Sequence, residues 1–426
     1  MPRSRTVIIG LDGVPISLIK RLTEQNVMPN LKEVLKDGVL RKMRSSLPEV
    51  SAVSWSSIIT GKNPGEHGVF GFTDLLKGFY VLSFHSSKKL KAAPFWRIDR
   101  TRRYVIINLP ATYPAGEVNG VLISGFVSPD IEGAVYPKSY LRVLRERNYR
   151  IDVDVEKARQ SESLFIQSLM ETLDSRLKVA DYFWKNIKWD IFMLVFTGTD
   201  RLEHFLWDAY EDPNNIYHQD FLKFFSAIDE AIGEITSRIS EDDSLVMLSD
   251  HGMERIEVNV NLNSLLVEEG FLVVENNPRK NYNSIKRETK AFALEPSRVY
   301  LHRKGRYPRG SVEKNDEEHL LSELEETFYS LRYKGRKVIR KVWRRNEIYK
   351  GKFKDEAPDL VLTPEKGFNL RAKLFSNQIF EREHELTGKH TWDDAFFYMK
   401  GVDADDVPLD FSAEDALRIA GVLKGD

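Results

Sequence analysis

The sequence contains no cysteine among its 426 residues. Disulfide bonds, thiolate metal sites and cysteine nucleophiles are therefore excluded, and any metal ion must be held by oxygen and nitrogen ligands. A dominant charge of one sign is also missing, because 63 Lys and Arg residues stand against 64 Asp and Glu residues. Since no net field holds a polyanion by charge alone, we expect neither a nucleic-acid coat role nor a membrane partner.

Long hydrophobic runs are absent as well. No segment approaches the roughly 18 apolar residues that a membrane helix requires. The first residues, MPRSRTVIIG, lack the apolar core and cleavage site of a secretory signal, so we expect a cytoplasmic protein. What is present, 42% hydrophobic and 11% aromatic residues, is typical of a folded globular protein.

Short apolar runs with strand character alternate with longer helical patterns along the chain. Strands are expected at residues 7–11, 104–107, 121–124, 191–196 and 245–248, and long helices at about 161–185 and 220–239. This alternation predicts an α/β protein with a mainly parallel sheet.

One region breaks this pattern. Residues 276–289 are polar and without period, which predicts a surface loop, and a basic, aromatic region with a helix at about 317–331 follows as far as residue 353. Its run KVIRKVWRR, from Lys337, is interpreted as a solvated, partly amphipathic face in preference to a nucleic-acid patch. We therefore predict a catalytic core of residues 1–275 and 354–426, with residues 276–353 as an inserted cap region.

Polar residues with metal-ligand chemistry follow three of the predicted strands. They are Asp12, Asp200 and the pair Asp250 and His251. Because the carboxyl ends of parallel strands meet at one edge of a sheet, these side chains are expected to converge. Taken singly, each aspartate is as typical of a helix cap or turn. Asp200 and His204 are four residues apart, and so share one face of a helix.

A serine and a late histidine complete the candidates. Ser51 stands at the start of a helical stretch that ends at Gly61, where free backbone N–H groups and the helix dipole favour a phosphate. Ser51 or Ser54 could equally be an N-cap. The GKN that begins at Gly61 lacks the spacing of a P-loop. His390 follows a glycine-containing turn and, alone, would be an ordinary surface residue.

In this order the motifs resemble the alkaline phosphatase superfamily, and within it the type I phosphodiesterase/nucleotide pyrophosphatase family. The matching blocks are GLDG, a serine before TG-x-x-P-x-x-HG, D-x-x-x-H, DHG and a late G-x-H, and they extend over most of the chain. The resemblance implies an alkaline-phosphatase-like three-layer α/β/α sandwich with a cap region. It also implies one metal ion surrounded by Asp12, Ser51, Asp250 and His251, and a second held by Asp200, His204 and His390.

Two divalent ions held this way would suit an in-line displacement at phosphorus, with Ser51 as a nucleophile that forms a covalent intermediate. The ligands permit Zn²⁺, Mn²⁺ or iron, and the resemblance favours Zn²⁺. The expected activity is hydrolysis of phosphate diesters or nucleotide pyrophosphate bonds in a small phosphate-ester substrate. The alternatives are a phosphomonoesterase or phosphomutase on the same scaffold, and a non-catalytic binding protein that retains the fold.

Two positions depart from the nucleotide pyrophosphatases. Ala52 stands where those enzymes carry an aromatic residue, and Ser54 stands where they carry an asparagine that binds a phosphate oxygen. Ser54 is therefore the candidate substrate-binding residue, and nucleotide preference stays open. The arginine that phosphomonoesterases of the superfamily use beside their serine is missing, which favours diesters.

Overall fold

The computed structural model of the protein describes residues 5–154, 156, 160–275, 281–382 and 385–424. The chain divides into two compact units. The first comprises Met1–Lys62, Ser86–Glu254 and Glu385–Asp426, and the second comprises Asn63–His85 and Arg255–His384. None of the helices in the described residues is long and apolar enough to span a membrane.

The first unit is built on an eight-stranded sheet in the order β2-β21-β9-β1-β8-β5-β6-β7. Its strands are β1 (Thr6–Leu11), β2 (Gly38–Met43), β5 (Tyr104–Leu109), β6 (Gly120–Ser124), β7 (Val135–Tyr136), β8 (Ile191–Phe196), β9 (Ser244–Leu248) and β21 (Ala395–Lys400). The neighbours β9, β1, β8, β5 and β6 run parallel, whereas β21, β2 and β7 pair antiparallel. The predicted α/β fold with a mainly parallel sheet is confirmed, and its five expected strands correspond to β1, β5, β6, β8 and β9.

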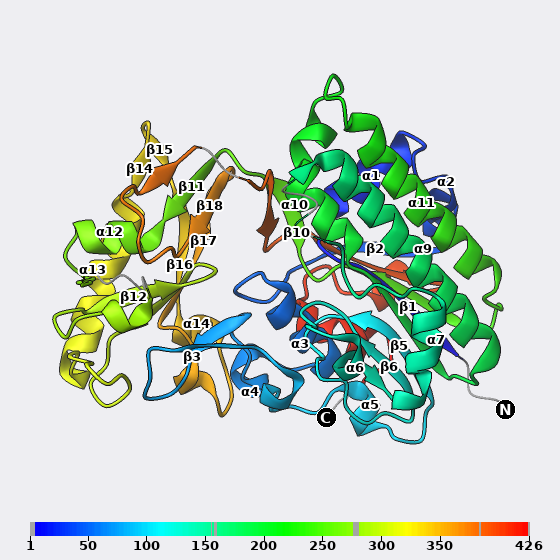
Figure 1. Ribbon diagram of the computed structural model, residues 1–426, viewed down its shortest axis with the longest axis horizontal. Coiled ribbons are helices and arrows are strands. Elements are labelled where there is room, and N and C mark those ends of the chain that lie inside the picture. The colour runs from blue at the N-terminus through cyan, green and yellow to red at the C-terminus, as the bar shows by residue number, and fades with distance from the viewer. Residues whose placement is uncertain (1–4, 155, 157–159, 276–280, 383–384, 425–426) are drawn as a thin grey trace. The chain divides into compact units, whose positions relative to one another are not determined.

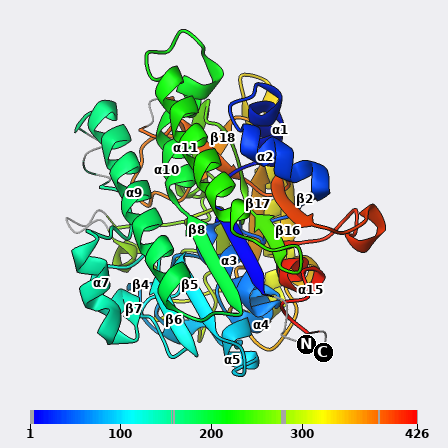
Figure 2. The same cartoon turned by 90° about the vertical axis from the view of Figure 1, so that its right-hand side faces the viewer.

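Helices cover both faces of this sheet because its strands are apolar on both sides. In β1, Val7 and Ile9 belong to one buried cluster and Ile8, which points the other way, belongs to another. The first cluster lies under α1 (Ile16–Glu24), α2 (Pro29–Val34), α9 (Glu162–Asn186), α10 (Gly198–Glu211) and α11 (His218–Ser237) (Figure 1). The second lies under α3 (Ser51–Thr60), α5 (Phe95–Ile98) and α15 (Ala416–Ile419). Short helices α6 (Ile131–Ala134) and α7 (Leu141–Glu146) also belong to this unit, and Figure 2 shows the sheet between its helices.

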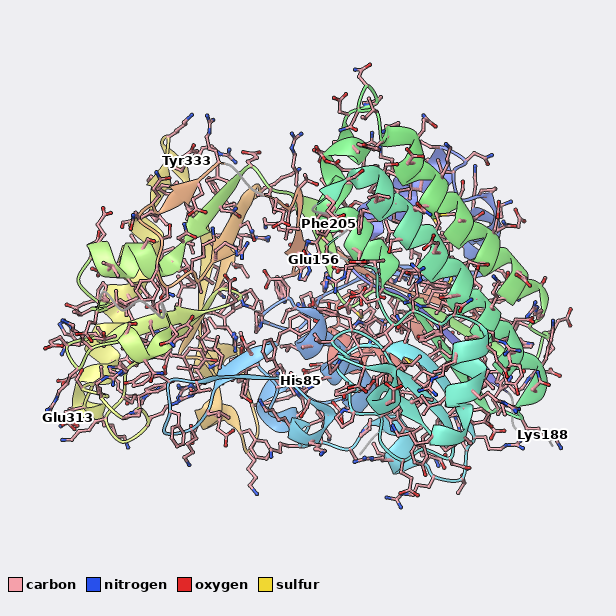
Figure 3. The ribbon with its side chains drawn as sticks, viewed as in Figure 1. His85, Glu156, Lys188, Phe205, Glu313 and Tyr333 are labelled. Atoms are coloured by element: carbon pink, nitrogen blue, oxygen red, sulfur yellow. The ribbon has the colours of Figure 1, made fainter. Side chains whose placement is uncertain are left out.

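Aromatic packing holds α10 in place at one edge of the helical layer. Phe205 on α10 lies with its ring centroid 4.9 Å from that of Phe165 on α9 (Figure 3). β10 (Gly252–Arg255) and β20 (Gly388–Thr391) form a two-stranded sheet. β20 contacts α10. The first turn of α10 is thereby fixed close to the end of β8.

The second unit has a core of its own. A four-stranded sheet comprises β12 (Ala291–Leu294), β13 (Arg298–Leu301), β17 (Leu360–Pro364) and β16 (Ile339–Arg344). A three-stranded sheet comprises β18 (Phe368–Arg371), β11 (Val258–Asn261) and β19 (Phe380–Glu381), and two hairpins are formed by β3 (Thr73–Leu75) with β4 (Leu82–Phe84) and by β14 (Arg332–Tyr333) with β15 (Arg336–Lys337). Its helices are α4 (Pro64–His67), α12 (Leu262–Glu268), α13 (Glu317–Ser330) and α14 (Arg345–Ile348).

This unit takes in the region predicted as a cap, residues 276–353, and extends beyond it on both sides. The reason is that Val258 from β11 and Leu360 from β17 are buried in one hydrophobic cluster with Phe292. The predicted loop at 276–289 falls in part outside the described residues, at 276–280. A capping role for the unit stays a prediction.

Most of the basic run that starts at Lys337 forms β16, Ile339–Arg344. Ile339 and Val342 are buried while the residues between them are not, and the register shifts between Ile339 and Lys341. Arg344, at its end, forms an ion pair with Glu325 on α13 at 2.6 Å. At least this part of the positive charge is therefore balanced within the chain.

Candidate metal centre

The polar residues that follow the parallel strands converge in the first unit. Asp12 comes directly after β1, Asp200 lies in the first turn of α10 after β8, and Asp250 lies two residues beyond β9. Ser51 is the first residue of α3, and His390 lies on β20. Neighbouring parallel strands end at the same edge of the sheet, so residues far apart in sequence meet there.

One group consists of Asp200, His204 and His390. The two imidazole Nε2 atoms lie 2.9 Å apart, and each is 3.3 Å from Asp200 Oδ1. The Nδ1 atom of His204 donates to the carbonyl of Gly388, and that of His390 donates to the carbonyl of Glu49, each at 2.8 Å. Because each Nδ1 donates to a carbonyl, the Nε2 atom of each ring points at the same small space.

The other group consists of Asp12, Asp250 and His251, with Ser51 beside it. The Ser51 hydroxyl donates to Asp12 Oδ1 at 3.3 Å and lies 3.2 Å from His251 Nε2. That Nε2 atom is 3.3 Å from Asp250 Oδ2. It is also 4.0 Å from Asp200 Oδ1, so the two groups are adjacent.

Donors behind the carboxylates orient them. The indole N–H of Trp55 donates to Asp12 Oδ2 at 3.1 Å, and the backbone N–H of Gly13 donates to Asp250 Oδ1 at 3.1 Å. Gly13 has φ +77°, and a Cβ at this position would lie 3.2 Å from Asp200 Cα. A glycine is needed here because the loop after β1 passes close to the start of α10 in a left-handed conformation.

The pKa values of the three aspartates are shifted because their carboxylates are buried close together. Burial raises the pKa of Asp12 well above its usual value, and the charges of Asp250 and Asp200 raise it further. Burial also raises the pKa of Asp250 to about 7. For Asp200 burial acts in the same direction, but His204 and His390 outweigh it and hold the pKa below its usual value.

Two of the three histidines, His204 and His251, are kept neutral by the same surroundings. Burial lowers the pKa of His204 to about 4 and lowers the pKa of His251 well below its usual range. Burial opposes protonation of His390 too, but the adjacent Asp200 carboxylate outweighs it and raises the pKa. Neutral His204 and His251 rings offer lone pairs to a cation at neutral pH.

The residues fit two divalent cations. In each group one ligand atom per residue lies within 4.8 Å of the others. Within the described part of the chain, Asp200 Oδ1 and Asp250 Oδ2 are buried without a hydrogen-bond partner, which is costly unless another positive group satisfies them. Oxygen and nitrogen donors of this kind suit Zn²⁺, Mn²⁺ or iron.

Sequence reasoning placed Asp12, Ser51, Asp200, His204, Asp250, His251 and His390 at this centre, and the structure brings all seven together. It does not bring Ser54 to either group. The Ser54 side chain is fully buried and its hydroxyl lies 2.7 Å from Ser45 Oγ. Binding of substrate by Ser54 therefore stays a prediction, and it would require the hydroxyl to leave Ser45.

Two further residues were not foreseen. Trp55 lies one helical turn after Ser51, and that spacing was the only available signal that its indole would share the Ser51 side of α3. Glu203 is fully buried on α10, and neither carboxylate oxygen has a hydrogen-bond partner among the described residues. Burial and the neighbouring Asp200 and Asp12 charges raise the Glu203 pKa well above its usual value. Nothing in the sequence marks a glutamate as buried.

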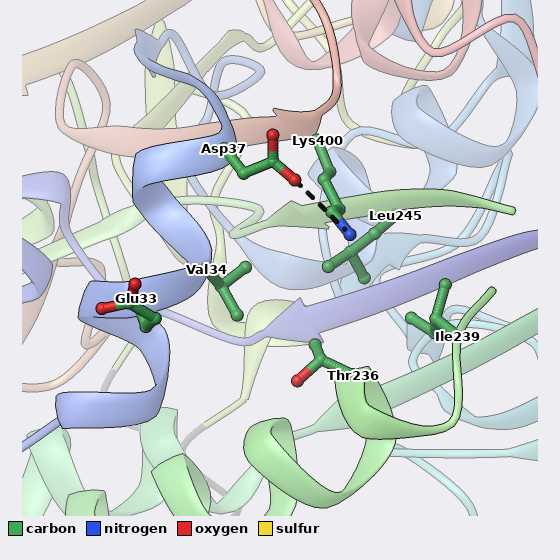
Figure 4. A pocket seen from close by; sticks show the side chains of 7 residues that line it. All are labelled: Glu33, Val34, Asp37, Thr236, Ile239, Leu245 and Lys400. Atoms are coloured by element: carbon green, nitrogen blue, oxygen red, sulfur yellow. Dashed lines mark ion pairs between the residues drawn. The ribbon is translucent and has the colours of Figure 1, made fainter. Parts of the chain in front are cut away.

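A cavity of about 270 Å³ lies elsewhere in the first unit (Figure 4). It is lined by Glu33, Val34, Asp37, Thr236, Ile239, Leu245 and Lys400. Leu245 lies at the beginning of β9, whereas Asp250 follows the end of that strand. The cavity is therefore at the opposite edge of the sheet from the metal ligands and is not part of this centre.

Comparison with known proteins gives one family match. The family model described as type I phosphodiesterase / nucleotide pyrophosphatase matches residues 6–393. No curated protein matches the chain.

Several solved structures share the fold. A phosphonoacetate hydrolase from Sinorhizobium meliloti 1021, in complex with phosphonoacetate, is 16% identical with a TM-score of 0.67, covering 99% of this chain and 96% of that one. Murine ectonucleotide pyrophosphatase/phosphodiesterase 5, as an inactive variant with AMP, is 12% identical with a TM-score of 0.55, covering 98% and 94%. The human protein of the same name is 11% identical with a TM-score of 0.55, covering 98% and 93%.

Proposed function

Because this chain belongs to the type I phosphodiesterase/nucleotide pyrophosphatase family, we propose that it hydrolyses phosphate diesters or pyrophosphate bonds with two divalent metal ions and a covalent intermediate on Ser51. The family, part of the alkaline phosphatase superfamily, makes it a phosphoric ester hydrolase. The observation that carries the finer proposal is the position of Ser51. Its hydroxyl lies between a carboxylate of one candidate metal group, Asp12, and the imidazole of His251.

The proposed ligands are the seven residues of the centre. Asp12, Ser51, Asp250 and His251 would hold one ion, and Asp200, His204 and His390 the other. When bound, two divalent ions supply Lewis-acid stabilisation of phosphoryl oxygens and favour ionisation of the nucleophile. The mixed oxygen and nitrogen donors support zinc, with manganese or iron as alternatives.

Ser51 is well placed to attack phosphorus. It begins α3, and Val50 before it provides no side-chain cap. The first-turn N–H groups and the helix dipole therefore favour a phosphate next to the hydroxyl. Asp12 accepts the hydroxyl proton in a hydrogen bond, and so directs an oxygen lone pair away from itself.

The reaction then has two halves. In the first, Ser51 Oγ bonds to phosphorus, the bond from phosphorus to the leaving oxygen breaks, and the proton lost by Ser51 is taken up, in net terms, by that oxygen. In the second, a water oxygen bonds to phosphorus and the Ser51 oxygen leaves and regains a proton. The helix N-terminus stabilises the charge on the phosphoryl group in both halves.

The residues that follow Ser51 lack the side chains that a nucleotide-selective site would use. Ala52 offers no ring on which a base could stack, and Ser54 is buried against Ser45. These features support a small phosphate diester as the substrate. A phosphonate belongs in the substrate panel, since the similar hydrolase from Sinorhizobium meliloti is described with phosphonoacetate.

The test compares the metal-loaded protein with a Ser51→Ala variant on bis(p-nitrophenyl) phosphate and on p-nitrophenyl phosphate. We expect the diester to be the better substrate and the variant to lose at least about a thousandfold in kcat. Acid quenching of the wild type should leave a phosphoryl adduct on the peptide that contains Ser51. The control is Ser56→Ala on the same helix, whose hydroxyl donates to the carbonyl of Ala52. Equal turnover by Ser51→Ala and wild type would exclude Ser51 as the nucleophile.

A further inference from the structure

The two carboxylate oxygens of Asp200 have different surroundings. Oδ1 lies 3.3 Å from the Nε2 atoms of His204 and His390, and 4.0 Å from that of His251. Oδ2 lies 3.6 Å from Nη1 of Arg201, with which it forms an ion pair. One oxygen is therefore close to the imidazoles of the metal centre, and the other is close to a guanidinium.

This ion pair joins two consecutive residues of α10. Side chains at neighbouring positions of a helix point about 100° apart and do not normally face each other. Two residues outside the helix hold the Arg201 side chain in this position. Its Nε and Nη2 atoms donate to Asp152 Oδ2 at 3.2 and 2.8 Å, and its guanidinium carbon lies 4.0 Å from the centroid of the Phe126 ring. Arg201 is therefore oriented by contacts from distant parts of the chain.

The segment that carries Asp152 is itself fixed by α9. Arg176 of α9 is fully buried, and its guanidinium donates to the carbonyl of Ile151 at 3.1 Å. The Ser168 hydroxyl, also on α9, accepts a hydrogen bond from the backbone N–H of Asp154 at 3.2 Å. The backbone on both sides of Asp152 is thus tied to the buried face of a long helix, and its carboxylate can hold a guanidinium in one place.

Asp152 also balances the charge of Arg201. An unpaired guanidinium this close to a cation site would repel the cation, so by charge alone an arginine is a poor neighbour for a metal ligand. Because two N–H groups of Arg201 donate to one carboxylate, the pair has no net charge, while Nη1 lies beside Asp200. The pair can therefore orient Asp200 with little repulsion of a bound cation.

Burial makes this contact matter for the direction in which Asp200 points. The exposed fractions of the side chains are 10% for Asp200, 13% for Arg201 and 19% for Asp152. Water screens charges in such a place less than at the surface. The χ2 torsion of an aspartate is broad, so an unrestrained carboxylate could present either oxygen to a cation. The ion pair at Oδ2 leaves Oδ1 for the metal site.

We propose that Arg201 is a positioning residue of the metal centre: paired with Asp152, it fixes Asp200 so that Oδ1 alone binds a cation. The inference rests on the two-metal part of the proposed function. It gives a role to a position that the family motif D-x-x-x-H leaves open, since Arg201 stands at the first x of that motif.

The test is a titration of chelator-treated protein with Zn²⁺, and in parallel with Mn²⁺, against a competing coloured chelator that yields a Kd for each ion. The main variant combines Arg201→Gln with Asp152→Asn, which replaces the ion pair by neutral side chains and leaves the net charge unchanged. We expect one ion to bind about 10- to 100-fold more weakly, the usual loss when a residue that orients a metal ligand is removed. The other ion should bind as in the wild type.

Two further variants show which ion is affected and why. In His390→Ala, which removes a ligand of the ion at Asp200, the double substitution should leave the affinity for the remaining ion unchanged. Arg201→Lys keeps the charge but lacks the planar fork that reaches Asp152 and Asp200 together, so it should also weaken the ion at Asp200. Wild-type affinity in Arg201→Lys would mean that charge alone acts, and would overturn the inference.

The matched control combines Arg5→Gln with Asp243→Asn. Arg5 also donates from Nε and Nη2 to one carboxylate, at 3.1 and 2.6 Å, and its guanidinium lies 4.6 Å from the centroid of the Trp189 ring. Arg5 precedes β1 whereas Asp12 follows the end of that strand, so this pair lies at the opposite edge of the sheet from the metal ligands. The control should lower the stability of the metal-free protein in urea without changing the affinity for either ion.

Unchanged or tighter metal binding in the main variant would overturn the inference, as would equal weakening of both ions or an equal loss of affinity in the control. The wild-type titration separates this failure from failure of the proposed function. A wild type that binds two ions supports the two-metal proposal whatever the variants do. A wild type that binds neither Zn²⁺ nor Mn²⁺ would overturn that proposal and this inference with it.

Discussion

The Nε2 atoms of His204 and His390 lie 2.9 Å apart although 186 residues separate them in the chain. Both rings donate from Nδ1 to a backbone carbonyl, which turns their Nε2 atoms towards each other. Both Nε2 atoms also lie 3.3 Å from Asp200 Oδ1, and a cation shared by the three atoms makes this arrangement favourable. This pair of imidazoles therefore gives the most direct support for a metal site.

Addition of Zn²⁺ or Mn²⁺ to protein treated with a chelator should raise its melting temperature. A ligand that binds the folded state at a hundred times its Kd stabilises it by about 2.7 kcal/mol. Elemental analysis should find two ions in the wild type and fewer in His390→Ala. No thermal shift with any divalent ion would contradict the proposal.

The control for that variant is His218→Ala. His218 also donates from Nδ1 to a backbone carbonyl, that of Ala209 at 2.8 Å, but it lies on α11, outside both groups. Its loss should leave the metal content unchanged. A drop equal to that of His390→Ala would indicate a general effect on folding.

Trp55→Phe should weaken the metal site without removing a ligand. The variant loses the N–H that donates to Asp12 Oδ2. Loss of such an outer donor typically costs about 10- to 100-fold in metal affinity or activity. Metal titration and kcat measure the effect, and Trp343→Phe, which loses a bond to Thr363 in the second unit, is the control. Equal effects in the two variants would remove Trp55 from the site.

Gly13→Ala should lower the free energy of unfolding by more than alanine does at Gly335, a glycine in a turn. Gly13 and Gly335 have nearly the same φ, +77° and +78°, but only at Gly13 would a Cβ meet a neighbour, Asp200. We expect each alanine to cost about 1 kcal/mol of unfolding free energy from its backbone conformation alone. Gly13→Ala should cost about 1 kcal/mol more and also lower metal affinity. Urea unfolding of both variants tests this, and equal losses would contradict it.

The ion pair of Arg5 with Asp243 predicts a specific pH dependence. Burial alone would raise the pKa of Asp243, but hydrogen bonds from Arg5 and Ser240 outweigh it and lower the pKa to about 2, from 3.8 in an unfolded chain. The stabilisation is therefore complete above about pH 4 and is lost as the pH falls through about 2.

Asp243→Asn should then destabilise the protein by about 1 kcal/mol at pH 7, a modest value because Arg5 is partly exposed. Urea unfolding at pH 3 should show a smaller difference between variant and wild type. The exposed neighbour Asp242, as Asp242→Asn, should show no difference at either pH. An undiminished effect at pH 3 would refute the assignment.

Much of the fold could be predicted from local sequence. Residues 191–196 read as a continuous apolar run and form β8 with those bounds, because a parallel strand covered on both faces has no polar side. The helix expected at about 161–185 is α9, Glu162–Asn186. The division into units was harder to predict, because residues 63–85 belong to the second unit through contacts that no local sequence pattern indicates.

In the candidate site too, some residues could be predicted from the sequence and others could not. Asp12 and Asp250 could be proposed because the ends of parallel strands are a general meeting place for ligands. His390 had weight only through the order of the family motifs. The Ser45 partner of Ser54 and the buried state of Glu203 could not be foreseen, because burial results from everything that packs around a side chain.

The sequence by itself determined the layered α/β architecture and the residue types available for two metal ions, because both follow from local periodicity and from chemistry that each residue carries alone. The tertiary structure decided which imidazole nitrogens face each other, which indole supports Asp12, and that Ser54 pairs with Ser45. Those properties belong to pairs of residues distant in the chain, and they exist only once folding has brought the partners together.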